Sequence, residues 1–173
     1  QPVFSFFYYT NVGYFQQIKT SQGDQIIPSE KLYNTMESKL HIFDANGLKH
    51  YRLVHESVPN QYVSGGAQEL GYKQVYNTLF GKNNPVPIEY SGYVKIFEYV
   101  SGATIIGSTS PNTEIKIENS ILTNINRSIY YKQVTTSDTH GMFNLTVPYS
   151  TTGYILNQTK FDTKPKGQYL LTV

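Results

Sequence analysis

The second half of the chain consists of short segments in which apolar and polar residues alternate. Such alternation places every second side chain on the same face of a β-strand. Turn residues separate these segments at intervals of about ten positions, which is typical of an antiparallel β-sandwich. The predicted strands cover residues 93–100, 103–107, 114–118, 129–135 and 142–147, with turns at 110–112, 124–126 and 138–141. In the last strand, we expect Phe143, Leu145 and Val147 to point inward and the polar residues between them to point outward.

The first half contains one clear helical pattern. Ser29 can cap this helix, and Glu30 suits its first turn because a carboxylate is stabilised at a helix N-terminus. The apolar residues that follow at helical spacing are Leu32, Met36, Leu40 and Phe43. Residues 44–47, Asp-Ala-Asn-Gly, are expected to end the helix, because Asn and Gly readily adopt the left-handed conformation of helix C-termini.

The other segments of the first half give weaker signals. Residues 3–9 are strongly apolar and predict a buried strand, whereas residues 13–23 are expected to form turns. Residues 50–56 predict a further strand, on which Arg52 and Glu56 would share one face. Residues 70–80 fit either a short helix or an irregular segment.

The pattern changes near Ser91-Gly92, where we expect a domain boundary. Helical and strand patterns are mixed before this point, and only strand patterns follow it. The sequence therefore predicts a mainly β protein with one or two helices. An α+β segment at residues 1–91 would precede an antiparallel β-sandwich domain at residues 92–173.

The composition is that of a folded β-rich protein. The 173 residues include 16 Tyr and 9 Phe, which favours β structure and argues against disorder. The 14 basic residues are scattered, so we expect no nucleic acid partner. Cys is absent, which excludes disulfides and thiolate catalysis. No segment approaches the roughly 18 apolar residues of a membrane span. Because the chain begins with Gln1 rather than Met, we expect it to be a fragment or a processed product.

Residues with catalytic chemistry form no convincing motif. His41, Asp44, His50 and His55 come nearest to a zinc site, but His50 and His55 would point to opposite faces of a strand. The chain lacks a Gly-x-Ser-x-Gly nucleophile motif and a phosphate-binding glycine loop. Arg52, one of only two arginines, is instead expected to form a structural ion pair with a carboxylate. An isolated hydrolase therefore stays a minor alternative.

Three Asn-x-Ser/Thr sequons occur in the chain. Their acceptor residues are Asn126, Asn144 and Asn157. Sequons also arise by chance in a chain this rich in Asn, Ser and Thr. They become candidate N-glycosylation sites if the domain faces the outside of the cell.

The segment 32–57 resembles part of a known family. In order, it contains Thr35-Met36, Leu40-His41, Phe43-Asp44, Gly47-Leu48, His50-Tyr51-Arg52-Leu53-Val54 and Glu56-Ser57. This pattern resembles the C-terminal globular region of archaeal oligosaccharyltransferase catalytic subunits, except that Ala45 stands where that family has glycine. Residues 94–105 and 147–153 are similar to the β domain that follows in the same family, so the resemblance extends from about residue 32 to 153.

The resemblance implies that this chain is part of a membrane enzyme. The full-length enzymes transfer a glycan from a dolichol phosphate carrier to the Asn of a sequon outside the cytoplasm, using a divalent metal such as Mn or Mg. Their Trp-Trp-Asp-Tyr-Gly signature recognises the Ser or Thr of the sequon, and this chain has no Trp. Their metal-binding acidic residues belong to the membrane part. The chain would therefore be an extracytoplasmic piece at the cell membrane, inactive alone, with no catalytic residue, metal site or cofactor of its own.

The role implied for such a piece is scaffolding of the acceptor-recognition region. The family-motif residues would be structural; they are Met36, His41, Phe43, Asp44, Gly47, Tyr51, Arg52, Glu56 and Ser57. The implied partners are the rest of its own chain and, through the full-length protein, the acceptor polypeptide and the dolichol-linked glycan. The alternative is an independent cell-surface β-sandwich that binds glycans or protein partners through its tyrosines.

Overall fold

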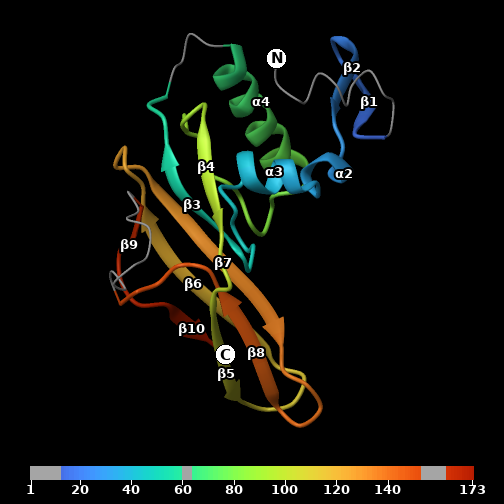
Figure 1. Ribbon diagram of the computed structural model, residues 1–173. Helices are drawn as coiled ribbons and strands as arrows, with labels where there is room; N and C mark the ends of the chain where they lie inside the picture. Colours follow the sequence, from blue (N-terminus) through green and yellow to red (C-terminus); the bar gives the residue numbers. More distant parts are fainter. Residues whose placement is uncertain (1–12, 60–63, 153–162) are drawn as a thin grey trace. The chain divides into compact units, whose positions relative to one another are not determined.

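The chain forms two compact units, each built from two separate stretches of sequence. The computed structural model describes residues 13–59, 64–152 and 163–173 (Figure 1). The first unit comprises Gln1–Phe43 and Pro59–Tyr93, and the second comprises Asp44–Val58 and Val94–Val173. The buried strand predicted at residues 3–9 lies outside the described residues.

The first unit begins with a β-hairpin, where the sequence predicted turns. Strand β1 (Phe15–Thr20) pairs antiparallel with β2 (Gly23–Pro28), and Thr20 lies opposite Gly23 across the tight turn (Figure 1). The prediction of turns throughout residues 13–23 is therefore wrong. Most residues of its two strands are exposed and polar side chains lie on both faces, so the apolar alternation that identifies a half-buried strand is missing.

The single helix predicted after Ser29 is also wrong, because two short helices take its place. Helix α2 (Glu30–Tyr33) ends before Thr35, which is extended at φ −68° and ψ 152°. The hydroxyl of Thr35 accepts a hydrogen bond from the Ser38 amide at 3.1 Å and so caps a new helix, α3 (Met36–His41). Met36 is consequently 50% exposed instead of sharing the buried face of Leu32.

Helix α4 (Ser64–Leu79) completes the first unit and settles the ambiguity of residues 70–80 in favour of a helix. Its Tyr72 joins Leu32, Tyr33 and Ile42 in the buried core of this unit. The Tyr33 hydroxyl donates a hydrogen bond to the Tyr72 carbonyl at 2.7 Å, which satisfies a polar group that would otherwise be costly to bury.

The second unit is built from antiparallel strands, as the sequence predicts. Strand β3 (Tyr51–Glu56) pairs with β4 (Lys95–Tyr99), and β5 (Ala103–Ser108) pairs with β8 (Met142–Val147). Strand β6 (Glu114–Leu122) pairs with β7 (Ser128–Thr136), with β9 (Lys164–Pro165) and with β10 (Leu170–Thr172). Figure 1 shows β6 and β7 as the longest pair of strands.

Alternating side chains of these strands enclose one core. Phe143, Leu145 and Val147 of β8 are buried, as predicted, and Asn144 between them is exposed. Isoleucines of β6 and β7 and Leu53 of β3 contribute to the same core. The prediction of a mainly β fold with few short helices and antiparallel sheets is therefore confirmed.

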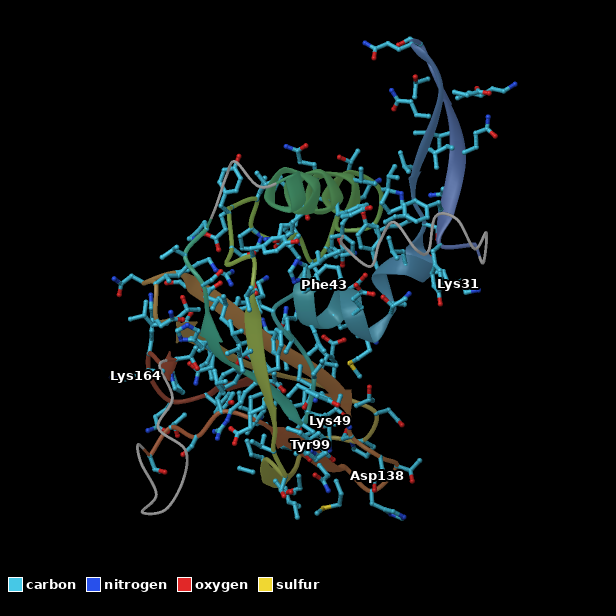
Figure 2. The ribbon with its side chains drawn as sticks, turned by 45° about the horizontal axis from the view of Figure 1, so that its top comes forward. Lys31, Phe43, Lys49, Tyr99, Asp138 and Lys164 are labelled. Atoms are coloured by element: carbon cyan, nitrogen blue, oxygen red, sulfur yellow. The ribbon has the colours of Figure 1, made fainter. Side chains whose placement is uncertain are left out.

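The turn between β7 and β8 is held by backbone geometry and by one carboxylate. Asp138, labelled in Figure 2, accepts hydrogen bonds from the amides of His140 and Met142, both at 2.8 Å. Gly141 adopts φ +79°, and a Cβ atom there would lie 2.0 Å from the Thr109 carbonyl oxygen. This position therefore requires glycine.

Candidate functional site

A buried cluster of opposite charges occupies the second unit, and its first member is Asp44. The segment that follows α3 turns through left-handed residues, with φ 53° at Asp44, 61° at Ala45 and 75° at Gly47. A left-handed alanine costs roughly 1–2 kcal/mol, which gives a physical reason why the family motif has glycine where this chain has Ala45. The turn directs the Asp44 carboxylate towards Arg127, which lies next to the start of β7.

Arg127 joins two carboxylates that lie far apart in the sequence. Its guanidinium donates to both oxygens of Asp44 at 2.7 and 2.8 Å, in the bidentate geometry that suits arginine. It also donates to Glu56 of β3 at 2.9–3.2 Å. The Glu56 side chain is completely buried, so this contact offsets a large desolvation cost.

Lys95 of β4 completes the cluster, which we name the Arg127 clamp: Asp44, Glu56, Lys95 and Arg127. The Lys95 ammonium lies 2.9 Å from Asp44. Burial alone would raise the pKa of Asp44, but Lys95 and Arg127 reverse this effect and hold that pKa well below its usual range. Burial would lower the pKa of Arg127, and its hydrogen bonds to Asp44 and Glu56 raise it instead.

The low pKa of Asp44 predicts a specific pH dependence of stability. Because this pKa is lower in the folded than in the unfolded state, the stabilisation is complete above about pH 4–5 and is lost only as the pH falls towards the folded value. We expect the difference in unfolding free energy between wild type and Asp44→Asn to stay constant from about pH 7 to 5 and to shrink below about pH 4. Urea unfolding of both proteins at a series of pH values measures this difference in unfolding free energy.

The control for this experiment is Asp24→Asn. Asp24 is exposed on the β1–β2 hairpin, where its carboxylate accepts a hydrogen bond from Gln17. Its substitution should change the unfolding free energy little at any pH, because exposed pairs contribute little. A difference between wild type and Asp44→Asn that already declines between pH 7 and 5 would contradict the assignment.

Arg52 forms a second ion pair, separate from the clamp. Its Nε and Nη2 atoms donate to the same Glu98 oxygen at 2.9 and 2.8 Å, so the predicted pairing with a carboxylate is confirmed. Arg52 lies opposite Glu98 and Glu56 opposite Lys95, with a β-bulge between Leu53 and His55. Glu98 and Lys95 are an odd number of residues apart, so Arg52 and Glu56 lie on opposite faces and the predicted shared face is wrong.

The other motif residues of the second unit support the turn and the β3–β4 pair. A Cβ atom at Gly47 would lie 3.2 Å from the Lys132 carbonyl oxygen. The Tyr51 ring packs edge-on against Tyr99 of β4, with centroids 5.5 Å apart. The Ser57 hydroxyl accepts a hydrogen bond from the Val94 amide at 3.1 Å.

Three motif residues belong to the first unit. Met36 is half exposed, and the Phe43 ring lies 4.8 Å from that of Tyr76 in a tilted, edge-on contact. His41 lies 3.8 Å from the buried carboxylate of Glu69 on α4. Glu69 also accepts a hydrogen bond from Ser91 at 2.6 Å and pairs with Lys73 at 2.8 Å. This second buried network was not predicted from the sequence.

The described residues offer no metal site. Within residues 13–59, 64–152 and 163–173, no three His, Asp or Glu side chains gather as metal ligands. The two buried carboxylates of the clamp do not fit a cation, because Arg127 and Lys95 already occupy their oxygens. His50, the third residue of the zinc hypothesis, lies with its Nδ1 atom 3.1 Å from the Val100 carbonyl.

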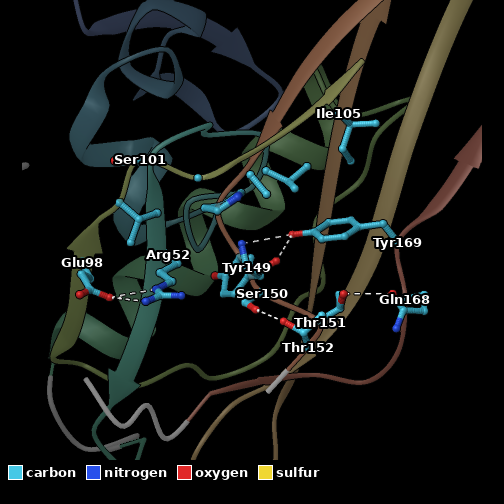
Figure 3. Close-up of a pocket in the computed structure, with 15 residues that line it drawn as sticks. Arg52, Glu98, Ser101, Ile105, Tyr149, Ser150, Thr151, Thr152, Gln168 and Tyr169 are labelled. Carbon is cyan, nitrogen blue, oxygen red and sulfur yellow. Dashed lines mark hydrogen bonds and ion pairs between the residues drawn. The ribbon is translucent and has the colours of Figure 1, made fainter. Parts of the chain in front are cut away.

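An open groove of about 810 Å³ lies over the ends of β4, β5 and β8 in the second unit. Figure 3 shows the Arg52–Glu98 pair at one side, Tyr149 next to it and Tyr169 at the other side, where the Tyr169 hydroxyl donates to the Tyr149 carbonyl. Hydroxyl and amide groups of Ser150, Thr151, Thr152 and Gln168 line another part of the groove. This combination of aromatic and uncharged polar groups suits a ligand rich in hydroxyls, such as a sugar.

The sequons differ in their surroundings. Asn126 is exposed in the turn between β6 and β7, at a left-handed φ of 62°. Asn144 is exposed within strand β8. Asn157 lies outside the described residues.

The comparison with protein families agrees with the resemblance inferred from the sequence. Residues 102–173 match the family described as the archaeal glycosylation protein B long peripheral domain. In this match and in the fold of solved structures, the chain is similar to the C-terminal peripheral-domain region of archaeal AglB oligosaccharyltransferases. None of the helices in the described part of the chain is long and apolar enough to cross a membrane.

The chain is similar in sequence to two archaeal glycotransferases. The chain is 34% identical over 189 residues to dolichyl-phosphooligosaccharide-protein glycotransferase 3 of Archaeoglobus fulgidus, covering 84% of this chain and 22% of that protein. It is 37% identical over 117 residues to dolichyl-monophosphooligosaccharide–protein glycotransferase AglB of Haloferax volcanii, covering 63% of this chain and 10% of that protein. The chain therefore spans less than a quarter of the length of these relatives.

Solved structures show the same fold. The A. fulgidus AglB complex with an inhibitory peptide and a dolichol-phosphate is similar at a TM-score of 0.77 and 29% identity, over 92% of this chain and 24% of that one. An A. fulgidus oligosaccharyltransferase complex with Zn and sulfate gives a TM-score of 0.76 and 29% identity, over 92% and 26%. A third A. fulgidus structure is tethered to an acceptor peptide that contains an NVT sequon. It gives a TM-score of 0.75 and 30% identity, over 92% of this chain and 24% of that one.

Proposed function

We propose that this chain is a non-catalytic, extracytoplasmic part of a membrane oligosaccharyltransferase that N-glycosylates sequons. Its role is to support the acceptor-recognition region, which lies elsewhere in the full-length protein. The chain's partners are then the remainder of that protein and, through it, the acceptor polypeptide and the dolichol-linked glycan. We expect the remainder to hold any divalent metal used in transfer; among the described residues, the clamp carboxylates Asp44 and Glu56 are already paired with Lys95 and Arg127.

The observation that carries this proposal is the Arg127 clamp. The motif residues Asp44 and Glu56 direct their carboxylates to Arg127 in the interior of the unit and not to an open site. Carboxylates held in this way cannot act as general bases or nucleophiles, because their oxygens are occupied and, for Glu56, fully buried. They instead fix the segment that follows α3 to strands β3, β4 and β7.

Transfer of a glycan to an acceptor peptide tests the proposal. We expect activity in the full-length protein, lower or no activity after deletion of residues 92–173, and none in the isolated 173-residue chain. Arg127→Met in the full-length protein should shorten the half-life of activity on heating and leave the KM for the acceptor peptide unchanged. Transfer by the isolated chain would overturn the proposal.

The alternative function is an independent β-sandwich that binds glycans. The groove beside Tyr169 favours it, because that groove combines an aromatic ring with several hydroxyl and amide groups. The same experiment separates the two functions. Full retention of activity and of heat stability after deletion of residues 92–173 would favour the independent binding domain.

A further inference from the structure

The outer face of the β5–β8 pair presents a complete sequon in an extended strand. Asn144 lies opposite Ile106, and Thr146 lies opposite Thr104, so both sequon residues point to the same face. The alternate residue, Leu145, is buried in the core. Within the described residues, no hydrogen bond engages the side-chain amide of Asn144 or the hydroxyl of Thr146. The two groups that define an Asn-x-Thr acceptor are therefore available together.

Two exposed apolar side chains lie next to Asn144 on this face. Ile106, directly opposite, is 67% exposed, and Met142, two residues earlier on the same face, is 45% exposed. Side chains directly opposite in an antiparallel pair have Cβ atoms about 5 Å apart. A sugar linked to Asn144 would reach both, and its carbon–hydrogen face would cover apolar surface that is otherwise in water.

The sequon at Asn126 is built differently. The middle residue, Arg127, is the centre of the clamp and is buried. The Ser128 hydroxyl already accepts a hydrogen bond from the Lys166 ammonium at 2.6 Å. Asn126 itself is left-handed, so the chain bends at the acceptor residue. The fold therefore does not present the acceptor amide and the hydroxyl together on one extended face.

We propose that Asn144 is an N-glycosylation site and that its first sugar covers Ile106 and Met142, whereas Asn126 is not modified. This inference rests on the proposed extracytoplasmic location. In the reaction, the Asn144 amide nitrogen forms a bond to the anomeric carbon of a polyprenyl-phosphate-linked oligosaccharide. The bond from that carbon to the phosphate oxygen breaks, the phosphate leaves with the electron pair, and the proton lost from the amide nitrogen is taken up by the released lipid phosphate or by water. The donor is the lipid-linked oligosaccharide of the host cell.

The test is glycopeptide mass spectrometry on the full-length protein made in an archaeal host with intact glycosylation. A flexible C-terminal tag containing Asn-Ala-Thr reports whether this end of the protein meets the glycosylation machinery. We expect glycan on the tag and on the peptide containing Asn144, and at least tenfold lower occupancy at Asn126. Thr146→Ala should abolish modification of Asn144, whereas the separate variant Thr146→Ser keeps a sequon and should retain it.

The outcomes are distinguishable. A modified tag with unmodified Asn144 overturns the site while the proposed location stands. Equal glycan occupancy of Asn126 and Asn144 overturns the proposal that the fold allows modification of Asn144 and not of Asn126. An unmodified tag contradicts the proposed location and, with it, the site. Ser128→Ala is the matched control, because it destroys the other sequon and should leave the occupancy of Asn144 unchanged.

Discussion

Replacement of Arg127 by methionine is expected to destabilise the protein by about 3–5 kcal/mol, because it leaves buried carboxylates without their guanidinium. Methionine keeps much of the aliphatic length of arginine and lacks the guanidinium group with its charge and donors. Glu56 is then the critical group, since its side chain is completely buried and Arg127 donates to both of its oxygens. Asp44 keeps Lys95, so the loss falls mainly on the contact between β3 and the start of β7. Urea unfolding at pH 7 measures the change.

Arg52→Met is the matched control for this prediction. Arg52 is similarly buried, but its partner Glu98 is 34% exposed and can be solvated when the arginine is removed. We therefore expect a loss well below that of Arg127→Met. Equal losses for the two variants, or a loss under about 1 kcal/mol for Arg127→Met, would show that the clamp is not the main electrostatic support of the unit.

Gly141→Ala is expected to cost about 2–4 kcal/mol, from left-handed strain together with displacement of the β7–β8 turn. The added methyl group would meet the Thr109 carbonyl oxygen at 2.0 Å, and backbone atoms cannot rotate away as a side chain does. The turn would have to move, which weakens the bond from the Thr109 amide to the Gly141 carbonyl, now 2.8 Å long. Thermal and urea unfolding of the purified chain measure the loss.

Gly167→Ala provides the comparison for the turn. A Cβ atom at Gly167 would have no heavy atom within 4 Å, so we expect a change of less than about 0.5 kcal/mol. If Gly141→Ala were equally mild, the turn would be able to shift without loss. Glycine would then be tolerated at position 141 but not required there.

The strands of the second unit could be predicted because each faces the core on one side and water on the other. Burial of alternate residues in β6 and β8 follows the period of two that the sequence displays. The β1–β2 hairpin was not predicted, because its strands are largely exposed and carry polar residues on both faces. The break between α2 and α3 depends on one cap, where the Thr35 hydroxyl competes with continuation of the helix.

The site was only partly predictable. Family-motif residues such as Asp44 and Glu56 could be selected from the sequence, but their partner Arg127 lies 83 and 71 positions away along the chain. Local patterns contain no information on such contacts. The one available signal was the scarcity of arginine, with two among 14 basic residues, and both arginines are buried and form ion pairs. The bulge in β3, which sends Arg52 and Glu56 to opposite faces, leaves no mark in the residue pattern.

Strands β3 and β4 are hydrogen-bonded neighbours, yet the second stretch of the first unit, Pro59–Tyr93, separates them in the sequence. The chain leaves the sheet after Ser57 and returns at Val94, and the Ser57 amide donates to the Val94 carbonyl at 2.9 Å. The segment is thus an insertion in a hairpin whose two ends are already joined. Changing the length of such an insertion costs little additional loop-closure entropy. Evolution could therefore enlarge, shorten or exchange this insertion without altering the register of the sheet that carries it.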